Sequence, residues 1–185
     1  MTARARALVV IDLQRGVLSD PGTWDAEGVV ARTADLVARA RRGGTPVIWV
    51  QHNSDELVAG ETAWGLADGV APADDEPVVQ KRYGDAFADT ELAQVLDGLG
   101  VRHLVVAGAQ TDACIRATVH GAVVRGHDVT LVSDCHTTGE LPAEFTGGAV
   151  IPARTKIDFT NAYVHWGLTY PDASGTTARA LDLQL

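Results

Sequence analysis

Three reactive side chains follow three strand-like stretches of this chain. Asp12 comes directly after the apolar run ALVVI, Lys81 ends PVVQK, and Cys114 lies shortly after VRHLVVAGA. A thiol can act as a nucleophile, a carboxylate can take its proton, and an ammonium group can offset the negative charge of both. Together these residue types favour covalent chemistry at a carbonyl carbon.

Taken singly, each residue has a plainer explanation. An Asp after a strand often caps a turn, a lone Lys is usually a solvated surface charge, and a Cys on a helix is more often a small core residue than a nucleophile. The three residues together are stronger evidence for a reactive site than any one of them alone, because the strands and helices that carry them are expected to bring them to one place.

Those elements are strands and helices in regular alternation. The strands are expected at 7–13, 46–52, 76–82, 101–109 and 127–135, after a short lead-in, and helices at about 29–40, 92–99 and 112–125, the first with Asp25 as its cap. This alternation predicts one domain over 1–185, a three-layer α/β/α sandwich with a mainly parallel sheet. Asp12, Lys81 and Cys114 then meet beyond the carboxyl ends of the strands, where such folds bind ligands.

The turn GAQTDAC, residues 108–114, connects a strand to the start of a helix. The positive end of the helix dipole is expected to lower the pKa of the Cys114 thiol. Backbone N–H groups at a helix start lack helical partners, so they can bind a developing oxyanion. The turn therefore predicts a nucleophile beside an oxyanion hole.

Two regions lack such regular patterns. Residues 53–76 form a long, Gly-containing segment whose length predicts a lid over a site. Residues 137–185 are turn-rich, with a helix expected over 156–168 and an edge strand over 180–185. Trp64, the large apolar residue within the lid, is expected either to line the pocket or to pack the segment onto the body.

The composition narrows the class of protein. The chain has 185 residues, 46% hydrophobic and 21% charged, with a formal net charge of −9 and two cysteines. The negative charge argues against nucleic-acid or anionic-membrane partners, and no apolar run is long enough to span a membrane. Two cysteines make no disulfide framework, so the expected location is the cytoplasm.

Several stretches resemble the isochorismatase-like cysteine hydrolases, which include nicotinamidases and N-carbamoylsarcosine amidase. They are VVIDLQRG, PVVQKRYGDAF, TELAQVLDGLGVRHLVVAGAQTDACIRAT and GHDVTLVSDCHTT, spread over most of residues 7–138. WVQHNSDELVAGETAW, together with the residues around Cys114, also resembles streptothricin-hydrolase-like members that open a lactam.

The resemblance implies a role for each site residue. Asp12 would be the general base, Lys81 the supporting cation and Cys114 the nucleophile. The peptide bond between Ala109 and Gln110 would be cis, and the N–H groups of Gln110 and Cys114 would form the oxyanion hole. The resemblance also implies a homo-oligomer, a dimer or tetramer, with the apolar segment 165–171 as a candidate interface.

The end of the second strand and the segments after the second and third strands supply the candidate substrate contacts, which are Gln51, His52, Trp64, Tyr83 and Phe87. Metal-dependent relatives carry an Asp and His residues after the second strand, whereas this chain has Gln51, His52 and Asn53. We therefore expect neither a metal nor another cofactor.

The leading hypothesis is a metal-independent cysteine hydrolase that cleaves a C–N bond of a small amide, lactam or ureido substrate through a thioester. One alternative is an isochorismatase-type vinyl-ether hydrolase, but relatives with that chemistry do not need the cysteine. Another is a binding or redox-responsive protein in which Cys114 is merely reactive.

Overall fold

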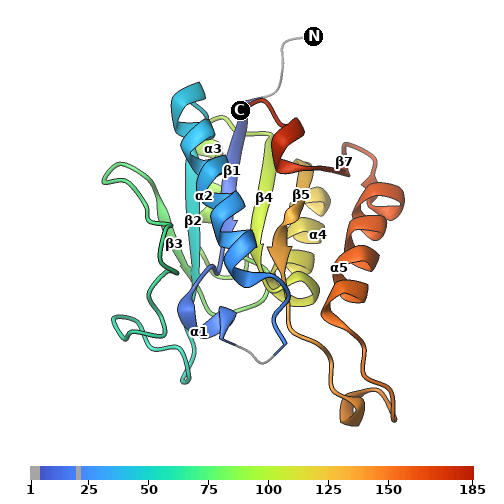
Figure 1. The fold of residues 1–185 in the computed structure, drawn as a ribbon. Helices are drawn as coiled ribbons and strands as arrows, with labels where there is room; N and C mark the ends of the chain where they lie inside the picture. The colour runs from blue at the N-terminus through green and yellow to red at the C-terminus, as the bar shows by residue number, and fades with distance from the viewer. Residues whose placement is uncertain (1–4, 20–21) are drawn as a thin grey trace.

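β1 (Arg6–Ile11) runs through the middle of a seven-stranded sheet in the order β3-β2-β1-β4-β5-β7-β6. The computed structural model describes residues 5–19 and 22–185, so residues 1–4 of the expected lead-in lie outside it (Figure 1). The strands are parallel except β6, which pairs antiparallel with β7. The other strands are β2 (Val47–His52), β3 (Val78–Lys81), β4 (His103–Ala109), β5 (Asp128–Thr137), β6 (Thr169–Tyr170) and β7 (Ala173–Ala178).

Both faces of the sheet are buried because alternate residues of each strand point to opposite sides. On β1, Val9 and Ile11 pack with α3 and α4, whereas Leu8 and Val10 pack with α2. The central strands therefore read as continuous apolar runs. The three-layer α/β/α sandwich predicted from the sequence is confirmed.

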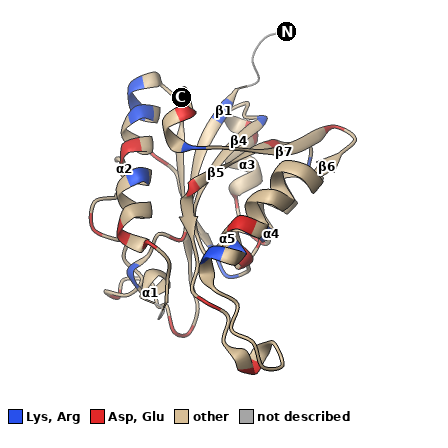
Figure 2. Cartoon of the chain, turned by 45° about the vertical axis from the view of Figure 1, so that its right-hand side comes forward, with Lys and Arg blue, Asp and Glu red and all other residues tan. Residues whose placement is uncertain are grey.

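The helices lie on the two faces of the sheet, and the charged residues are found mainly in these helices and in the loops (Figure 2). No helix among the described residues is long and apolar enough to cross a membrane. The helical segments are α1 (Arg15–Leu18), α2 (Ala26–Gly43), α3 (Leu92–Gly98), the π-helical η1 (Thr111–Ile115), α4 (Arg116–Val124), the 3-10 turn η2 (Ala143–Phe145), α5 (Ala153–Ala162), the π-helical η3 (Tyr163–Gly167) and the 3-10 turn η4 (Ala180–Asp182).

Three details differ from the sequence expectations. Asp25 precedes α2, but its side chain makes no capping hydrogen bond and pairs instead with Arg32 at 2.7 Å. The edge strand expected at 180–185 is wrong, because residues 180–182 form a 3-10 turn. The strand lies earlier, at β7, whose sequence ASGTTA carries no large apolar residue to signal it.

The long segment 53–77 contains no helix or strand, as expected. Near its end, Glu76 contacts α2 and β2. The Glu76 carboxylate accepts hydrogen bonds from Arg41 Nε and Nη2, both at 2.7 Å, from Trp49 Nε1 at 2.7 Å and from the Ala73 backbone N–H at 2.9 Å. Burial alone would raise the pKa of Glu76, but these hydrogen bonds outweigh it and lower the pKa from 4.5 to about 2.

The depressed pKa of Glu76 predicts a pH-dependent contribution to stability. The contribution is present above pH 4.5 and is lost as the pH falls through about 2. Glu76→Gln is expected to lower the free energy of unfolding at pH 7 by on the order of 2 kcal/mol. Below pH 4, the free energies of unfolding of the variant and the unaltered protein should differ less. Denaturant titrations at several pH values measure this, with the exposed Glu61→Gln as control; a difference that does not change with pH would contradict it.

Candidate active site

Asp12, Lys81 and Cys114 meet at the edge of the sheet where β1, β3 and β4 end. Asp12 directly follows β1, Lys81 is the last residue of β3, and Cys114 lies in η1 just after β4. The segments that follow β2 and β5 extend beyond this same edge (Figure 1). Because these parallel strands end at the same edge of the sheet, three residues that are far apart in the sequence lie close together.

The Lys81 ammonium group links the other two side chains. Its Nζ lies 2.7 Å from Asp12 Oδ2 and 3.1 Å from Cys114 Sγ. The Lys81 and Asp12 side chains are 0% and 1% exposed, so water screens their charges little. The second carboxylate oxygen, Asp12 Oδ1, is buried and accepts no hydrogen bond from the nitrogen or oxygen atoms of the described residues.

Burial changes the proton affinities of this group. It raises the pKa of Asp12, although Lys81 opposes the shift. Burial, followed by the nearby Asp12 charge, raises the pKa of the Cys114 thiol to about 11. The expectation of a lowered thiol pKa is therefore wrong, since desolvation and the carboxylate outweigh Lys81 and the helix start. Cys114 is therefore expected to rest as a neutral thiol.

His52 and Tyr83 complete the surroundings of Lys81. Lys81 Nζ lies 3.1 Å from His52 Nδ1 and donates to the Tyr83 backbone oxygen at 3.2 Å. Asp12, His52 and Cys114 present possible metal-ligand atoms within 4.8 Å of one another. The ammonium group lies among all three, so a metal ion bound by them would have to displace it.

The turn that carries Cys114 has a specific local geometry. The peptide bond between Ala109 and Gln110 is cis, and the Gln110 carbonyl accepts hydrogen bonds from the Ala113 and Ile115 N–H groups at 3.1 and 3.2 Å. Gly108 allows β4 to approach β1 closely here, because a Cβ at that position would lie 1.9 Å from the Ile11 oxygen. The helix expected at 112–125 thus begins as π-helix η1 and continues as α4.

Sequence reasoning missed two residues that position the site. Gln14, completely buried, donates to the backbone oxygens of His52 and Trp64 at 3.0 and 2.9 Å and accepts from the His52 N–H at 2.7 Å. Asp112 in η1 accepts from Thr138 Oγ1 at 2.6 Å and pairs with Lys156 Nζ at 2.9 Å. Gln14 lies two residues after Asp12, and Asp112 lies two residues before Cys114. This short distance along the sequence was the available indication that they contribute to the site.

The predicted substrate contacts have different environments. Gln51 is 5% exposed and donates to the Trp64 oxygen at 3.4 Å, while the Trp64 indole N–H donates to Asn53 Oδ1 at 2.9 Å. The Gln51 contact holds the 53–77 segment against β2, whereas the Asn53 contact lies within the segment. Tyr83 is 57% exposed beside Lys81, which leaves its side chain accessible.

Phe87 belongs to the core cluster on the face of the sheet that α3 and α4 cover. Its ring is 7% exposed, its centroid lies 6.0 Å from that of His127, and the Arg125 guanidinium lies 4.7 Å from it. His127 directly precedes β5, at the amino end of the strands and away from Asp12. These contacts give no support to the prediction that Phe87 contacts substrate, because its ring packs into the core.

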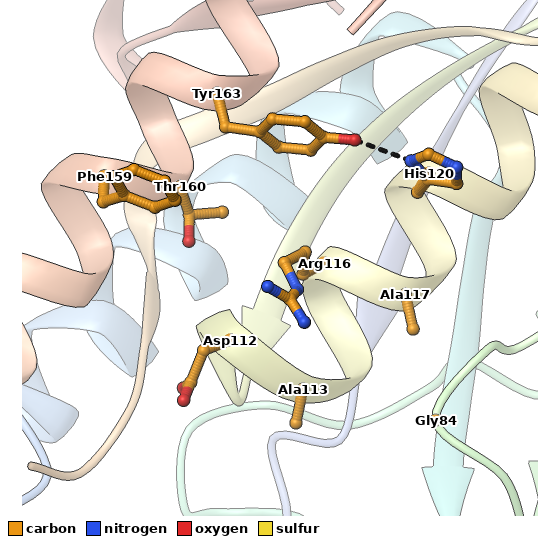
Figure 3. A pocket seen from close by; sticks show the side chains of 9 residues that line it. All are labelled: Gly84, Asp112, Ala113, Arg116, Ala117, His120, Phe159, Thr160 and Tyr163. Carbon is orange, nitrogen blue, oxygen red and sulfur yellow. Dashed lines mark hydrogen bonds between the residues drawn. The ribbon is translucent and has the colours of Figure 1, made fainter. Parts of the chain in front are cut away.

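An open cavity of about 720 Å³ lies between α4 and α5 (Figure 3). Its lining includes Ala113 and Gly84, which are sequence neighbours of Cys114 and Tyr83, but none of Asp12, Lys81 and Cys114. Its wall includes Tyr163, whose hydroxyl lies 2.6 Å from His120 Nδ1. The volume falls in the range of about 300–1,000 Å³ typical of small-molecule sites.

The raised thiol pKa leads to a prediction about alkylation. The rate of Cys114 modification by iodoacetamide is expected to rise from pH 7 to pH 10 with no plateau near about 8.5, the pKa of a free thiol. Cys135 is completely buried, and burial raises its pKa to about 12, so its labelling should be slower. Peptide mass spectrometry at each pH measures both rates; a plateau near pH 8.5, or equal labelling, would contradict the geometry.

Residues 6–148 match the model of the isochorismatase domain family. The chain therefore belongs to the isochorismatase family, and the resemblance drawn from its motifs is confirmed. An isochorismatase crystal structure from Pseudomonas putida superposes with a TM-score of 0.86 at 30% identity, covering 97% of this chain and 90% of that one.

Named relatives are also similar in sequence. Two streptothricin hydrolases of Streptomyces noursei are 38% and 37% identical over 152 residues, which cover 80% of this chain but only 60% and 55% of theirs. A maleamate amidohydrolase of Pseudomonas putida is 33% identical over 153 residues, covering 71% of this chain and 72% of the relative.

Proposed function

We propose that the protein is a cysteine hydrolase that cleaves a C–N bond of a small amide, lactam or ureido substrate through a thioester. The observation that carries the proposal is the buried contact of Lys81 Nζ with Asp12 Oδ2 at 2.7 Å and with Cys114 Sγ at 3.1 Å. The names of the relatives support it, because the maleamate relative is an amidohydrolase and the streptothricin relatives are hydrolases.

In the proposed reaction, Asp12 takes the thiol proton while Cys114 Sγ bonds to the carbonyl carbon. Burial raises the pKa of this carboxylate, which makes it a stronger base than a solvated one. The C–N bond then breaks, and Asp12 returns the proton to the leaving nitrogen. The product at this stage is a thioester between the acyl group and Cys114.

Water completes the cycle. Asp12 takes a proton from a water molecule as the water oxygen adds to the thioester. The C–S bond then breaks to release the acid, and Asp12 returns the proton to Cys114 Sγ. Lys81 offsets the negative charge that alternates between Asp12 and Cys114. The backbone N–H groups of Gln110 and Cys114 are proposed as donors to the oxyanion, and no metal or other cofactor takes part.

A panel of small carboxamides, lactams and ureido compounds, with isochorismate as a vinyl-ether substrate, tests this proposal. We expect release of ammonia or amine from members of the first group. Hydrolysis of isochorismate alone would favour the vinyl-ether alternative. Oxidised or disulfide-bonded Cys114 without any turnover would favour a redox-responsive protein.

We also propose that the protein acts in the cytoplasm as a homo-oligomer, without nucleic-acid or membrane partners. In segment 165–171, Leu168 is 1% exposed and packs into the core, whereas Trp166 is 82% exposed. A large apolar side chain left in water favours a subunit contact. Light scattering is expected to give a mass well above the 19.5 kDa of one chain, and a smaller mass for Trp166→Glu. A mass of 19.5 kDa for the unaltered protein would contradict the oligomer.

A further inference from the structure

His136, near the carboxyl end of β5, is a buried histidine that bridges α5 and the turn that carries Cys114. Its ring is 2% exposed, and its Nδ1 lies 2.9 Å from Thr111 Oγ1 in η1, while its Nε2 lies 3.1 Å from Asn161 Oδ1 on α5. Thr111 is completely buried and directly follows Gln110, whose N–H is a proposed oxyanion donor. The bridge therefore reaches the segment that holds both the thiol and the proposed oxyanion hole.

The pairing of β5 with β4 shifts register just before His136. Val106 of β4 pairs with Leu131, whereas Gly108 pairs with His136, so β5 has extra residues between the two pairs. Extra residues of this kind turn the side chains that follow them to a new direction. His136 thus lies opposite the end of β4, within reach of Thr111.

The hydrogen-bond partners determine which ring nitrogen of His136 carries the proton. Asn161 Nδ2 donates to the Ser133 backbone oxygen at 3.1 Å, so Asn161 Oδ1 faces the ring and accepts from Nε2. Nδ1 is then an acceptor, and the Thr111 hydroxyl donates to it. Burial lowers the pKa of His136 to about 4, although the Asn161 hydrogen bond opposes the shift, so the ring is neutral at pH 7.

A second bridge holds the next residue of η1. Thr138, which follows β5, donates from Oγ1 to Asp112 Oδ1 at 2.6 Å, and Lys156 Nζ on α5 lies 2.9 Å from Asp112 Oδ2. Two consecutive residues, Thr111 and Asp112, are thus held by the same two elements. A firm hold matters here, because a displacement of about 1 Å at a reacting group can lower the rate by about 100-fold.

We propose that His136 is a positioning residue, whose hydrogen bond with Thr111 fixes η1 and thereby holds the Cys114 thiol in its place in the site. His136 acts through Thr111 and takes no part in bond breaking. Its effect on turnover rests on the proposed cysteine chemistry, whereas its effect on the position of the thiol does not.

Two amide substitutions separate the two hydrogen bonds of the ring. His136→Asn can place an oxygen where Nδ1 lies and keep an acceptor for Thr111, whereas His136→Gln can place an NH₂ group near Nε2 and keep a donor for Asn161. For a substrate that is turned over, His136→Gln is expected to lower kcat by about ten- to a hundredfold with little change in KM. His136→Asn should retain most of kcat, and Thr111→Val, which removes the hydroxyl, should match His136→Gln.

The same two strands supply a matched control. His103 Nε2 lies 2.8 Å from Thr130 Oγ1, which makes a second histidine–threonine pair near the amino ends of β4 and β5. Thr130 is 4% exposed, so Thr130→Val should lower the free energy of unfolding, as Thr111→Val does, and leave kcat unchanged. Denaturant titrations and steady-state kinetics measure both. An equal loss of kcat in Thr130→Val, or unchanged kcat in His136→Gln and Thr111→Val, would overturn the proposal.

The combined variant tests whether the two residues act through one contact. Thr111→Val with His136→Gln should lower kcat no further than either change alone, because both remove the same hydrogen bond. Losses that multiply would contradict the proposal.

Iodoacetamide labelling of Cys114 gives a measure that does not need turnover. A thiol that is held less firmly is less buried, so at pH 8 both single variants should be labelled at least about threefold faster than Thr130→Val. Unchanged labelling in both would overturn this inference even if no amide is hydrolysed. Faster labelling in a protein that hydrolyses no amide would support this inference and contradict the proposed function alone.

Discussion

Cys114→Ser is expected to lower kcat for the amide substrate by at least about 10³-fold while leaving the fold intact. A serine hydroxyl is a far weaker nucleophile, and a single buried carboxylate is a poor base for removing its proton. The exchange of sulfur for oxygen changes the volume little at a half-buried position. Steady-state kinetics and thermal melting measure the two effects.

Cys135→Ala is the control for this change, because Cys135 is completely buried on β5 and faces the α2 side of the sheet. Its replacement should lower stability and leave kcat nearly unchanged. If Cys114→Ser kept a substantial part of the turnover, Cys114 would not be the nucleophile, and an Asp12-activated water would have to act directly.

Asp12→Asn is expected to lower kcat by about 10²–10⁴-fold, the usual contribution of a general base. The backbone at Asp12 has φ of 50°, a left-handed conformation that Asn also tolerates, so the substitution should preserve the local fold. The amide cannot accept the thiol proton in the physiological pH range. Steady-state kinetics measures the loss.

The same variant should make Cys114 more reactive toward iodoacetamide. The Asp12 charge is one of the causes that raise the thiol pKa to about 11, so its removal lowers that pKa and increases the thiolate fraction at pH 8. Turnover and alkylation are thus expected to change in opposite directions. A parallel fall in both would mean that Asp12 only holds the site together.

The apolar runs and their alternation with helical patterns were enough to predict the central strands and the three layers. Strands buried on both faces, such as β1 and β4, have distinctive sequences because every position packs against the core. β7 was missed because its residues are small. The strand lies nearer the edge of the sheet, where large apolar side chains are not required for packing. The π-helical start of the Cys114 turn has no sequence signal of its own.

Strand ends explain why Asp12, Lys81 and Cys114 could be predicted to meet. The contacts around them depend on side-chain directions, which spacing alone does not give. Phe87 was placed near the substrate because it follows Lys81 closely, yet its ring turns into the core beside His127. The direction in which the Cys114 pKa shifts could be found only from the structure, because burial and the Asp12 charge outweigh the effect of the helix start.

Mass spectrometry of the acid-quenched enzyme tests the central claim most directly, using whichever amide the substrate panel shows to be turned over. During turnover, the mass of the protein should increase by that of the acyl group. Peptide analysis should locate the addition on Cys114, and it should be absent from Cys114→Ser. Continued amide hydrolysis with no acylated Cys114 at any quench time would contradict the thioester mechanism.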